Sequence, residues 1–363
     1  GRTLVYELEA ETRDRVWQQN FSITDTHDVD LINGDQLLVA NMREYDDNNG
    51  TSNDRLFIYD LSEDKIVWEW YFKNHYPSET DGGMNDDWSH VNDVDKIEDG
   101  KYLVSPRNFD QVIVVNRSTK NITMQLGADQ KHAILNEQHD PQYLESQTGA
   151  PTVLVADSEN DRIVEYSCVN RSETGECQWE QVWVMGDDQL NWPRDADRLP
   201  NGNTLIVDSL GHRVIEVTPT GEIIWEVYTP WAPFDVERAV HGNEAGGPTM
   251  IDQNISGSYQ LSGSAGETPG TGTGTATTTF PEWIKTMVGG TPLNSPGSEF
   301  AEAWEGISQW IKPIWMAPWS LVYFTLDIVL LFVLATAEVI IHRRWISSRI
   351  RQALGRMRRP GSS

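Results

Sequence analysis

The sequence has few basic residues. It contains 28 lysines and arginines, of which only eight are lysine, against 55 aspartates and glutamates, and its net charge is −27. So large an acidic excess repels nucleic acid and anionic membrane surfaces, and we expect neither as a partner of the main body. We interpret the acidic surface as an adaptation to very high salt, where charge repulsion is screened, which makes the protein halophilic.

The sequence also has only two cysteines, Cys168 and Cys177. A zinc site is not expected, because two more ligands at metal spacing are missing nearby. The two cysteines lie in a stretch that reads as a hairpin, so an oxidising compartment would let them form a disulfide. Export is also indicated by Asn-x-Ser/Thr sequons, which are candidate glycosylation sites. They lie at Asn20, Asn49, Asn116, Asn121, Asn170 and Asn254.

Only one apolar run is long enough to cross a bilayer. Residues 321–341, LVYFTLDIVLLFVLATAEVII, would rise about 31 Å as a helix, against a bilayer core of about 30 Å. Tryptophans flank this run, and seven arginines follow it without an acid, which places the tail in the cytoplasm and the acidic body outside the cell. Asp327 inside the run favours a partner helix, so oligomerisation through the membrane is expected.

A strand pattern recurs four times between residues 26 and 229. Each copy begins with a polar residue followed by Asp, and it then passes a Gly-containing turn into an apolar strand, as in THDVDLINGDQLLVAN at residues 26–41. About four short strands joined by Asn, Asp and Gly turns are typical of a propeller blade. Residues 2–21 and 233–239 resemble parts of one further blade. We therefore predict an all-β propeller with five or six blades.

Composition divides the chain into five segments. Residues 1–256 form the propeller ectodomain, and residues 257–280 form a flexible stalk rich in Gly, Ser and Thr. Residues 281–318 form an amphipathic, tryptophan-rich juxtamembrane segment. Residues 319–342 form the transmembrane helix, and residues 343–363 form an arginine-rich cytoplasmic tail. Because the chain begins at Gly1 without a methionine, we expect that it was processed or trimmed.

One position near the start of each copy collects polar side chains. It holds His27, Asn92, His139 and Arg194, with Phe234 in the partial fifth copy. The first strand of each blade lines the central channel, so these side chains are expected to converge on one axis. His90 precedes Asn92 by two residues on the same strand face, and Arg107 ends a strand of the same repeat, so both can join the group.

This group suits an anion. Arginine binds sulfate or phosphate in a bidentate manner, and histidine adds charge-assisted hydrogen bonds or acts as a nucleophile or general base. The next residue in every copy is Asp, which could orient a histidine or could simply hold the strand. These residues are Asp28, Asp93, Asp140, Asp195 and Asp235.

A metal site is the rival use of these histidines and aspartates. The acidic loop DDNNGTSND at residues 46–54 could hold a structural Ca²⁺, although it matches a calcium loop only in part. We expect no metal in the active site and no other cofactor.

Three motifs resemble those of the arylsulfotransferase family of β-propellers. DWSHVNDVD at residues 87–95, LVSPRN at 103–108 and EQHDPQY at 137–143 are similar to that family's DWxHxN, SxRN and QHD signatures. The resemblance spans residues 2–255 and suggests a membrane-anchored, halophilic, archaeal-type member. It implies transfer of a sulfuryl group from an aryl sulfate to a phenol through a sulfated histidine, without a nucleotide cofactor.

By this resemblance His90 and His139 hold or polarise the sulfate, with Asn92 and Arg107 as helpers. The family's nucleophilic histidine belongs to a later blade, where this chain has Arg194, so His27 is a further candidate. Our hypothesis is sulfuryl transfer to a phenolic or other hydroxyl acceptor by His90, His139 and His27. Candidate substrate-binding residues are Asn92, Arg107, Arg194, Asp93 and Asp140. The alternative is a non-catalytic surface module that binds anions, glycans or envelope partners.

Overall fold

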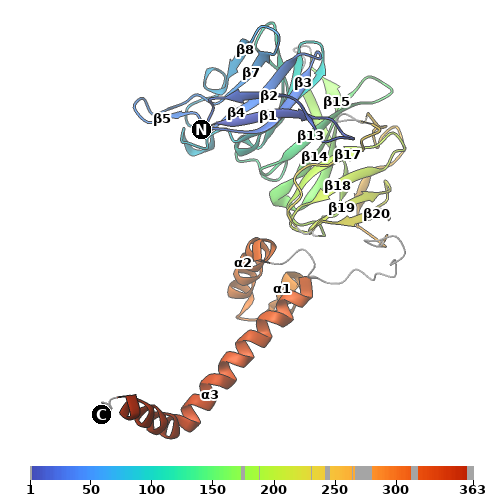
Figure 1. The fold of residues 1–363 in the computed structure, drawn as a ribbon. Coiled ribbons are helices and arrows are strands. Elements are labelled where there is room, and N and C mark those ends of the chain that lie inside the picture. The colour runs from blue at the N-terminus through green and yellow to red at the C-terminus, as the bar shows by residue number, and fades with distance from the viewer. Residues whose placement is uncertain are drawn as a thin grey trace. The chain divides into compact units, whose positions relative to one another are not determined.

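The computed structural model describes residues 2–172, 176–187, 189–229, 231–241, 246–263, 265, 280–311 and 318–357. The chain divides into two compact units, Gly1–Ala276 and Thr277–Ser363 (Figure 1). Most of the expected stalk, residues 266–279, lies outside the described residues. Each unit is therefore considered by itself.

Four antiparallel meanders of four strands follow one another along the described part of the first unit, and the third gains a further strand described below (Figure 1). The first sheet contains β3 (Asp25–Ile32), β4 (Gln36–Met42), β7 (Arg55–Asp60) and β8 (Lys65–Tyr71). The second contains β9 (Val91–Glu98), β10 (Lys101–Pro106), β11 (Gln111–Asn116) and β12 (Ile122–Gly127). The third contains β13 (His139–Glu145), β14 (Pro151–Asp157), β15 (Arg162–Arg171) and β16 (Cys177–Met185). The fourth contains β17 (Pro193–Arg198), β18 (Thr204–Asp208), β19 (Arg213–Val217) and β20 (Ile223–Tyr228).

The first strands of these sheets pack side by side, β3 against β9, β9 against β13, and β13 against β17. This is the arrangement of a propeller, in which the first strand of each sheet faces the axis. The all-β propeller class predicted from the repeats is confirmed. The number of blades and the closure of the ring stay predictions. The N-terminal segment forms a separate two-stranded sheet, β1 (Thr3–Leu8) with β2 (Arg15–Phe21), whereas residues 233–239, which were predicted to share its blade, form no strand. A small ribbon, β5 (Tyr45–Asp46) with β6 (Thr51–Ser52), projects from the first sheet.

Buried tryptophans join neighbouring sheets. The indole Nε1 of Trp70 on β8 donates to the Lys120 carbonyl of the second sheet at 2.8 Å, and Trp183 on β16 donates to the Pro219 carbonyl of the fourth sheet at 2.9 Å. Both side chains are at most 1% exposed. Each buries a large apolar surface and satisfies its one polar group, so the sequence's tryptophans stabilise the interfaces between sheets.

The ordered part of the first unit extends past residue 256. β21 (Gly257–Tyr259) pairs in parallel with β16 as a fifth strand of the third sheet, and Ser262 bridges to Glu222. These residues were predicted to belong to the flexible stalk. Their backbone hydrogen bonds to the sheet edge place them in the propeller unit instead.

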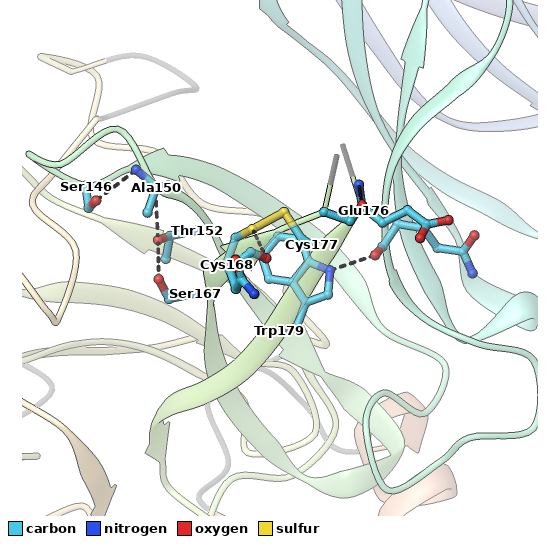
Figure 2. Close-up of a disulfide and its surroundings, with 11 residues drawn as sticks. Ser146, Ala150, Thr152, Ser167, Cys168, Glu176, Cys177 and Trp179 are labelled. Atoms are coloured by element: carbon cyan, nitrogen blue, oxygen red, sulfur yellow. Dashed lines mark hydrogen bonds between the residues drawn. A yellow bond between two sulfur atoms is a disulfide. The ribbon is translucent and has the colours of Figure 1, made fainter. Parts of the chain in front are cut away.

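Cys168 and Cys177 form the predicted disulfide, with their Cα atoms 5.2 Å apart. The bond joins β15 to β16 near the tip of their hairpin (Figure 2). Next to it, Trp179 donates through Nε1 to the Gln125 carbonyl of the second sheet at 2.7 Å. The disulfide therefore fixes a hairpin that also contacts the neighbouring sheet.

The sequon asparagines lie at or near the surface. Five are exposed, and Asn116 is half-buried because its side-chain oxygen accepts hydrogen bonds from the Ser118 and Thr119 backbone. Their glycosylation stays a prediction.

The second unit is helical. α1 (Phe280–Val288) and α2 (Asn294–Ile311) occupy the predicted tryptophan-rich segment, and α3 (Pro318–Met357) follows. The Phe280 ring packs 5.2 Å from Trp304 and 5.5 Å from Trp319. Within α3, Trp319–His342 has a mean hydropathy of 2.3 over 24 residues and is long and apolar enough to span a bilayer. The helix continues through the predicted tail to Met357.

Candidate active site

β-Bulges in the first strands position the side chains that the repeats single out. The pairing register of β3 skips His27, that of β9 skips Asn92 and that of β17 skips Arg194. β13 differs, because His139 pairs with Ala156 and the register leaves out Asp140 and Pro141 instead. A bulge leaves one residue out of the ladder and re-aims its side chain. The repeat alignment therefore identified a local backbone feature and not only a similarity of residue type.

The convergence predicted for these positions is found for His27, His90, His139, Arg194 and Phe234. The His27 and His90 rings lie 4.9 Å apart between centroids. Phe234 lies 6.0 Å from His27 and 5.8 Å from His139, and the Arg194 guanidinium lies 4.8 Å from its ring. We call these five residues, together with Arg107, the mouth cluster. A groove of about 360 Å³ beside His27 runs between β1 and β3.

His90 reaches the cluster by a different route from the one predicted. It was expected on the same strand face as Asn92, but it lies one residue before β9 with a φ of 38°, so a backbone turn directs its side chain. The Asp87 carboxylate lies 2.9 Å from Nδ1. A carboxylate accepts, so Nδ1 carries the proton and the Nε2 lone pair is free in the neutral ring. Burial lowers the pKa of His90 despite the opposing contact with Asp87, and Arg107 lowers it further.

His139 is fixed in the same tautomer by other partners. Its Nδ1 lies 3.1 Å from the Glu137 carbonyl and 2.9 Å from Ser158 Oγ. The Ser158 hydroxyl donates to the Pro193 carbonyl at 2.6 Å, so His139 Nδ1 faces two acceptors and must donate. Its Nε2 is buried and has no hydrogen-bond partner among the described residues. Burial lowers the pKa of His139 well below its ordinary value, and the nearby Arg194 adds to this effect.

Arg194 supplies the cluster with an unpaired cation. Its guanidinium stacks 3.6 Å from the Trp192 ring and 4.8 Å from the Phe234 ring. In the described part of the chain, no carboxylate lies within 4.0 Å of it. Burial and the neighbouring Arg107 lower the pKa of Arg194 to about 10, so it remains charged at neutral pH.

Arg107 is already engaged. It begins the short helix η3 (Arg107–Phe109), forms an ion pair with Glu137, and donates to Asn108 Oδ1 at 3.1 Å. Its Nη1 also lies 3.4 Å from His90 Nδ1. Arg107 therefore adds positive charge next to His90, although part of that charge is balanced by Glu137.

Asn92 supports the site from within the protein. It is 2% exposed, and its Nδ2 donates to the Gln138 carbonyl at 2.9 Å. Gln138 directly precedes His139, so this bond helps to hold the strand that carries the histidine. A direct contact between Asn92 and substrate stays a prediction.

The recurring Asp ties neighbouring sheets together. Asp28 Oδ2 accepts from the Val94 amide at 2.9 Å, and Asp195 Oδ2 accepts from the Val236 amide at 2.9 Å. Val94 directly follows Asp93, and Val236 directly follows Asp235. Each Asp thus accepts from the residue that follows the recurring Asp of the next copy. For Asp28 and Asp195 these bonds support the interpretation that the recurring Asp holds the strands and does not orient a histidine.

Asp93 breaks this pattern, because the donor for it would be the amide of residue 141, which is Pro141. Its Oδ2 is buried without a hydrogen-bond partner among the described residues, and its carboxyl group faces Asp140. Burial and nearby carboxylates raise the pKa of both Asp93 and Asp140 well above the ordinary value. Their predicted role in substrate binding stays a prediction.

Three contributors to the site were missed from the sequence. Asp87 lies in the DWSH motif three residues before His90, a spacing that could have identified it as the partner of the histidine. Ser158 occupies in the third sheet the place of Arg107 in the second, since each begins a short helix after the second strand. Trp192 lies only two residues before Arg194, but no motif in the sequence indicated that its ring stacks on the guanidinium.

The acidic loop at residues 46–54 uses its carboxylates internally. Asp46 accepts from the Asn48 amide at 3.0 Å, and Asp54 accepts from the Glu44 and Ser89 amides at 3.0 and 3.1 Å. These bonds engage two of the three carboxylates of the loop, and a structural Ca²⁺ in it stays a prediction.

Comparison with known proteins gives one family and several distant structures. The family model for arylsulfotransferase (ASST) matches residues 10–229. A streptogramin B lyase structure shares 11% identity over 63% of this chain and 59% of that chain, with a TM-score of 0.37. A virginiamycin B lyase from Staphylococcus aureus shares 11% over 63% and 61%, with a TM-score of 0.35. The β-propeller domain of Cps50 (Swd1) from Myceliophteria thermophila shares 14% over 63% and 71%, with a TM-score of 0.42.

The chain thus spans about three fifths of the length of the two lyases. No curated protein matches it. The family match covers more than half of the sequence and includes the three motifs at residues 87–95, 103–108 and 137–143. The chain therefore belongs to the arylsulfotransferase (ASST) family.

Proposed function

We propose that the mouth cluster transfers a sulfuryl group from an aryl sulfate to a phenolic or other hydroxyl acceptor through a sulfated histidine. The observation that carries this proposal is Arg194, a half-buried cation that forms no ion pair in the described part of the chain, beside imidazoles whose Nε2 lone pairs are free. A guanidinium that forms no ion pair can bind sulfate without first breaking a contact with a carboxylate. Its planar N–H donors also match two sulfate oxygens at once. Family membership supports the same reaction class.

His90 is the best nucleophile of the three histidines. Its tautomer is fixed by Asp87, and its side chain is 12% exposed, so a substrate can reach Nε2. His139 has the same tautomer, but its Nε2 is buried. His27 is exposed, yet none of the hydrogen bonds found among the described residues orients its ring. Exposure together with orientation therefore favours His90.

In the first step His90 Nε2 attacks the sulfur of the aryl sulfate. The N–S bond forms while the S–O bond to the aryl group breaks, and the electron pair leaves with the phenolate oxygen. Asp87 stabilises the positive charge of the sulfated imidazolium, and Arg194 and Arg107 neutralise the sulfuryl oxygens. In the second step the acceptor hydroxyl attacks the same sulfur, the N–S bond breaks, and the acceptor proton passes to a base, for which His139 Nε2 is suited.

The aromatic neighbours fit an aryl substrate. Phe234 contacts both His27 and His139, and the Trp192 and Phe234 rings both lie against the Arg194 guanidinium. An aryl ring placed beside Phe234 would bring its sulfate within reach of Arg194, and offset ring contacts would contribute about 1 kcal/mol.

The test uses the full chain, purified in detergent and concentrated salt, with a chromogenic aryl sulfate and a phenol acceptor. We expect release of the coloured phenol and a sulfuryl label on His90 by mass spectrometry. His90→Ala should reduce turnover about 10³-fold or more and remove the label. His139→Ala should keep the label but slow its transfer to the acceptor about 10²-fold. The control is His241→Ala, because His241 is exposed and lies outside the mouth cluster.

Full activity of a folded His90→Ala, His139→Ala double variant would refute this mechanism, and a label on His27 would transfer the nucleophile role to that residue. The alternative, a non-catalytic module for anions, glycans or envelope partners, is suggested by Arg194 at the position of the family's histidine. Sulfate binding that depends on Arg194, without turnover or label across several donors, would support it.

We also infer a single-pass cell-membrane protein with an extracellular propeller and a cytoplasmic tail. The disulfide and the apolar stretch Trp319–His342 support this location. Oligomerisation through α3 remains part of the same proposal, since Asp327 lies within the apolar stretch.

A further inference from the structure

Three of the recurring aspartates gather their carboxylates at one point. Asp140, Asp195 and Asp235 each offer an oxygen, and these oxygens all lie within 4.8 Å of one another. No lysine or arginine in the described part of the chain forms an ion pair with any of the three. Asp195 is buried, Asp140 half-buried and Asp235 exposed, and three ionised carboxylates this close without a positive partner repel one another.

A second observation points to a ligand at the same place. Asp93 is 3% exposed, and its Oδ2 has no hydrogen-bond donor in the described structure. Its carboxyl group faces Asp140. Asp28 and Asp195 accept from the backbone amide of the residue that follows the next recurring Asp. For Asp93 that residue is Pro141, which has no backbone N–H. A buried carboxylate oxygen without a donor needs a proton or a cation.

The surroundings add further negative charge. Two residues after four of the five recurring aspartates the sequence has a further acid, and after Asp140 it has Gln142 instead. These acids are Asp30, Asp95, Asp197 and Glu237. The repeats therefore carry oxygen-bearing side chains at two successive alternate positions of the sequence.

We propose that the channel binds one calcium ion between Asp140, Asp195 and Asp235, with the free oxygen of Asp93 directed at the same place. Hard oxygen ligands alone favour Ca²⁺ or Mg²⁺ over softer transition metals. Oxygens that lie within 4.8 Å of one another can bind one Ca²⁺ together, and Ca²⁺ accepts a shell built largely from protein oxygens, whereas Mg²⁺ usually keeps several waters. Asp235 is exposed, so an ion can enter from its side.

The ion would also organise the mouth cluster. Each of its three ligands directly follows a cluster residue in the sequence, since His139 precedes Asp140, Arg194 precedes Asp195 and Phe234 precedes Asp235. A single ion would thus cross-link three chain segments immediately next to the proposed anion site. This inference does not depend on sulfuryl transfer, because the ion would hold the same side chains in a module that only binds anions.

The test begins with the full chain treated with EGTA in buffer of fixed ionic strength. Calcium is then titrated while thermal unfolding is followed, and bound metal is counted after dialysis. We expect one calcium per chain and a melting temperature that rises with calcium concentration, because the ion binds only the folded state. Magnesium at the same ionic strength should raise it much less.

Two matched variants locate the ion. Asp235→Asn should weaken calcium binding at least about tenfold, and the exposure of this residue makes the substitution compatible with folding. Asp46→Asn, in the other acidic segment, should leave calcium binding unchanged. The proposal is overturned if the folded wild type binds no calcium at millimolar concentration, if magnesium acts equally, or if Asp46→Asn and not Asp235→Asn weakens binding. Those results would leave the Asp93–Asp140 contact as a carboxyl pair that shares a proton.

Discussion

Hydrogen bonds at Nδ1 determine what the two oriented histidines can do. His90 donates to a carboxylate, and His139 donates to a carbonyl and a hydroxyl. Only the carboxylate can balance the charge of a sulfated imidazolium, so the two rings are chemically different although they share a tautomer. This difference supports His90 as the nucleophile and His139 as the neutral base.

The pH dependence of turnover tests the Asp87–His90 pair. The pKa of His90 is lowered by burial, so the ring is neutral above pH 6.5 and kcat/KM should stay level there. As the pH falls through this lowered pKa, Nε2 is protonated and kcat/KM should fall. In Asp87→Asn the contact that raises the pKa is lost, so the acidic limb should move to lower pH while the plateau falls about 10²-fold.

The matched control for this experiment is Arg43→Gln. Arg43 Nε donates to Asp87 Oδ1 at 2.9 Å, and its charge lowers the pKa of His90. Its removal should move the acidic limb slightly to higher pH, opposite to Asp87→Asn, with little change in the plateau. An acidic limb that moves in the same direction in both variants would show that Asp87 does not act through His90.

At the scale of elements, the repeat pattern predicted the four sheets and the convergence of their first strands. Alternation and turn residues determine strand pairing locally, so a sequence reveals them. It could not reveal that His90 reaches the cluster through a turn, because a φ of 38° at a histidine is imposed by tertiary contacts. Nor could it reveal that Pro141 deprives Asp93 of a donor, since that amide belongs to a different sheet.

The hairpin of β15 and β16 carries the disulfide, and its removal has a predictable cost. Reduction, or the Cys168→Ala, Cys177→Ala double variant, should lower the free energy of unfolding by about 3 kcal/mol, because the unfolded loop regains its freedom. Turnover at low temperature should not change, since the bond joins strands remote from the mouth cluster in its sheet. Denaturant unfolding of the oxidised, reduced and variant proteins measures this effect. Equal stability of the three would contradict it.

At the scale of the whole molecule, the chain is strongly acidic, but positively charged side chains gather in the mouth cluster. The chain carries a net charge of −27, yet Arg107 and Arg194 lie together with three histidines in the mouth cluster. An acidic exterior repels a sulfate ester at low ionic strength, and salt screens this repulsion over about 10 Å at 0.1 M and about 3 Å at 1 M. High salt should therefore help both folding and the approach of an anionic substrate.

This argument predicts that stability rises steeply with salt. Raising KCl from about 0.1 M to about 2 M, with EGTA present so that calcium has no part, should raise the melting temperature because repulsion between surface carboxylates is screened. Sucrose at matched osmolality is the control, since it favours the compact state without screening charge. A melting temperature that responds equally to KCl and sucrose would contradict the halophilic interpretation. A larger response to KCl would support it, and the low number of lysines would then belong to the same adaptation as the excess of acids.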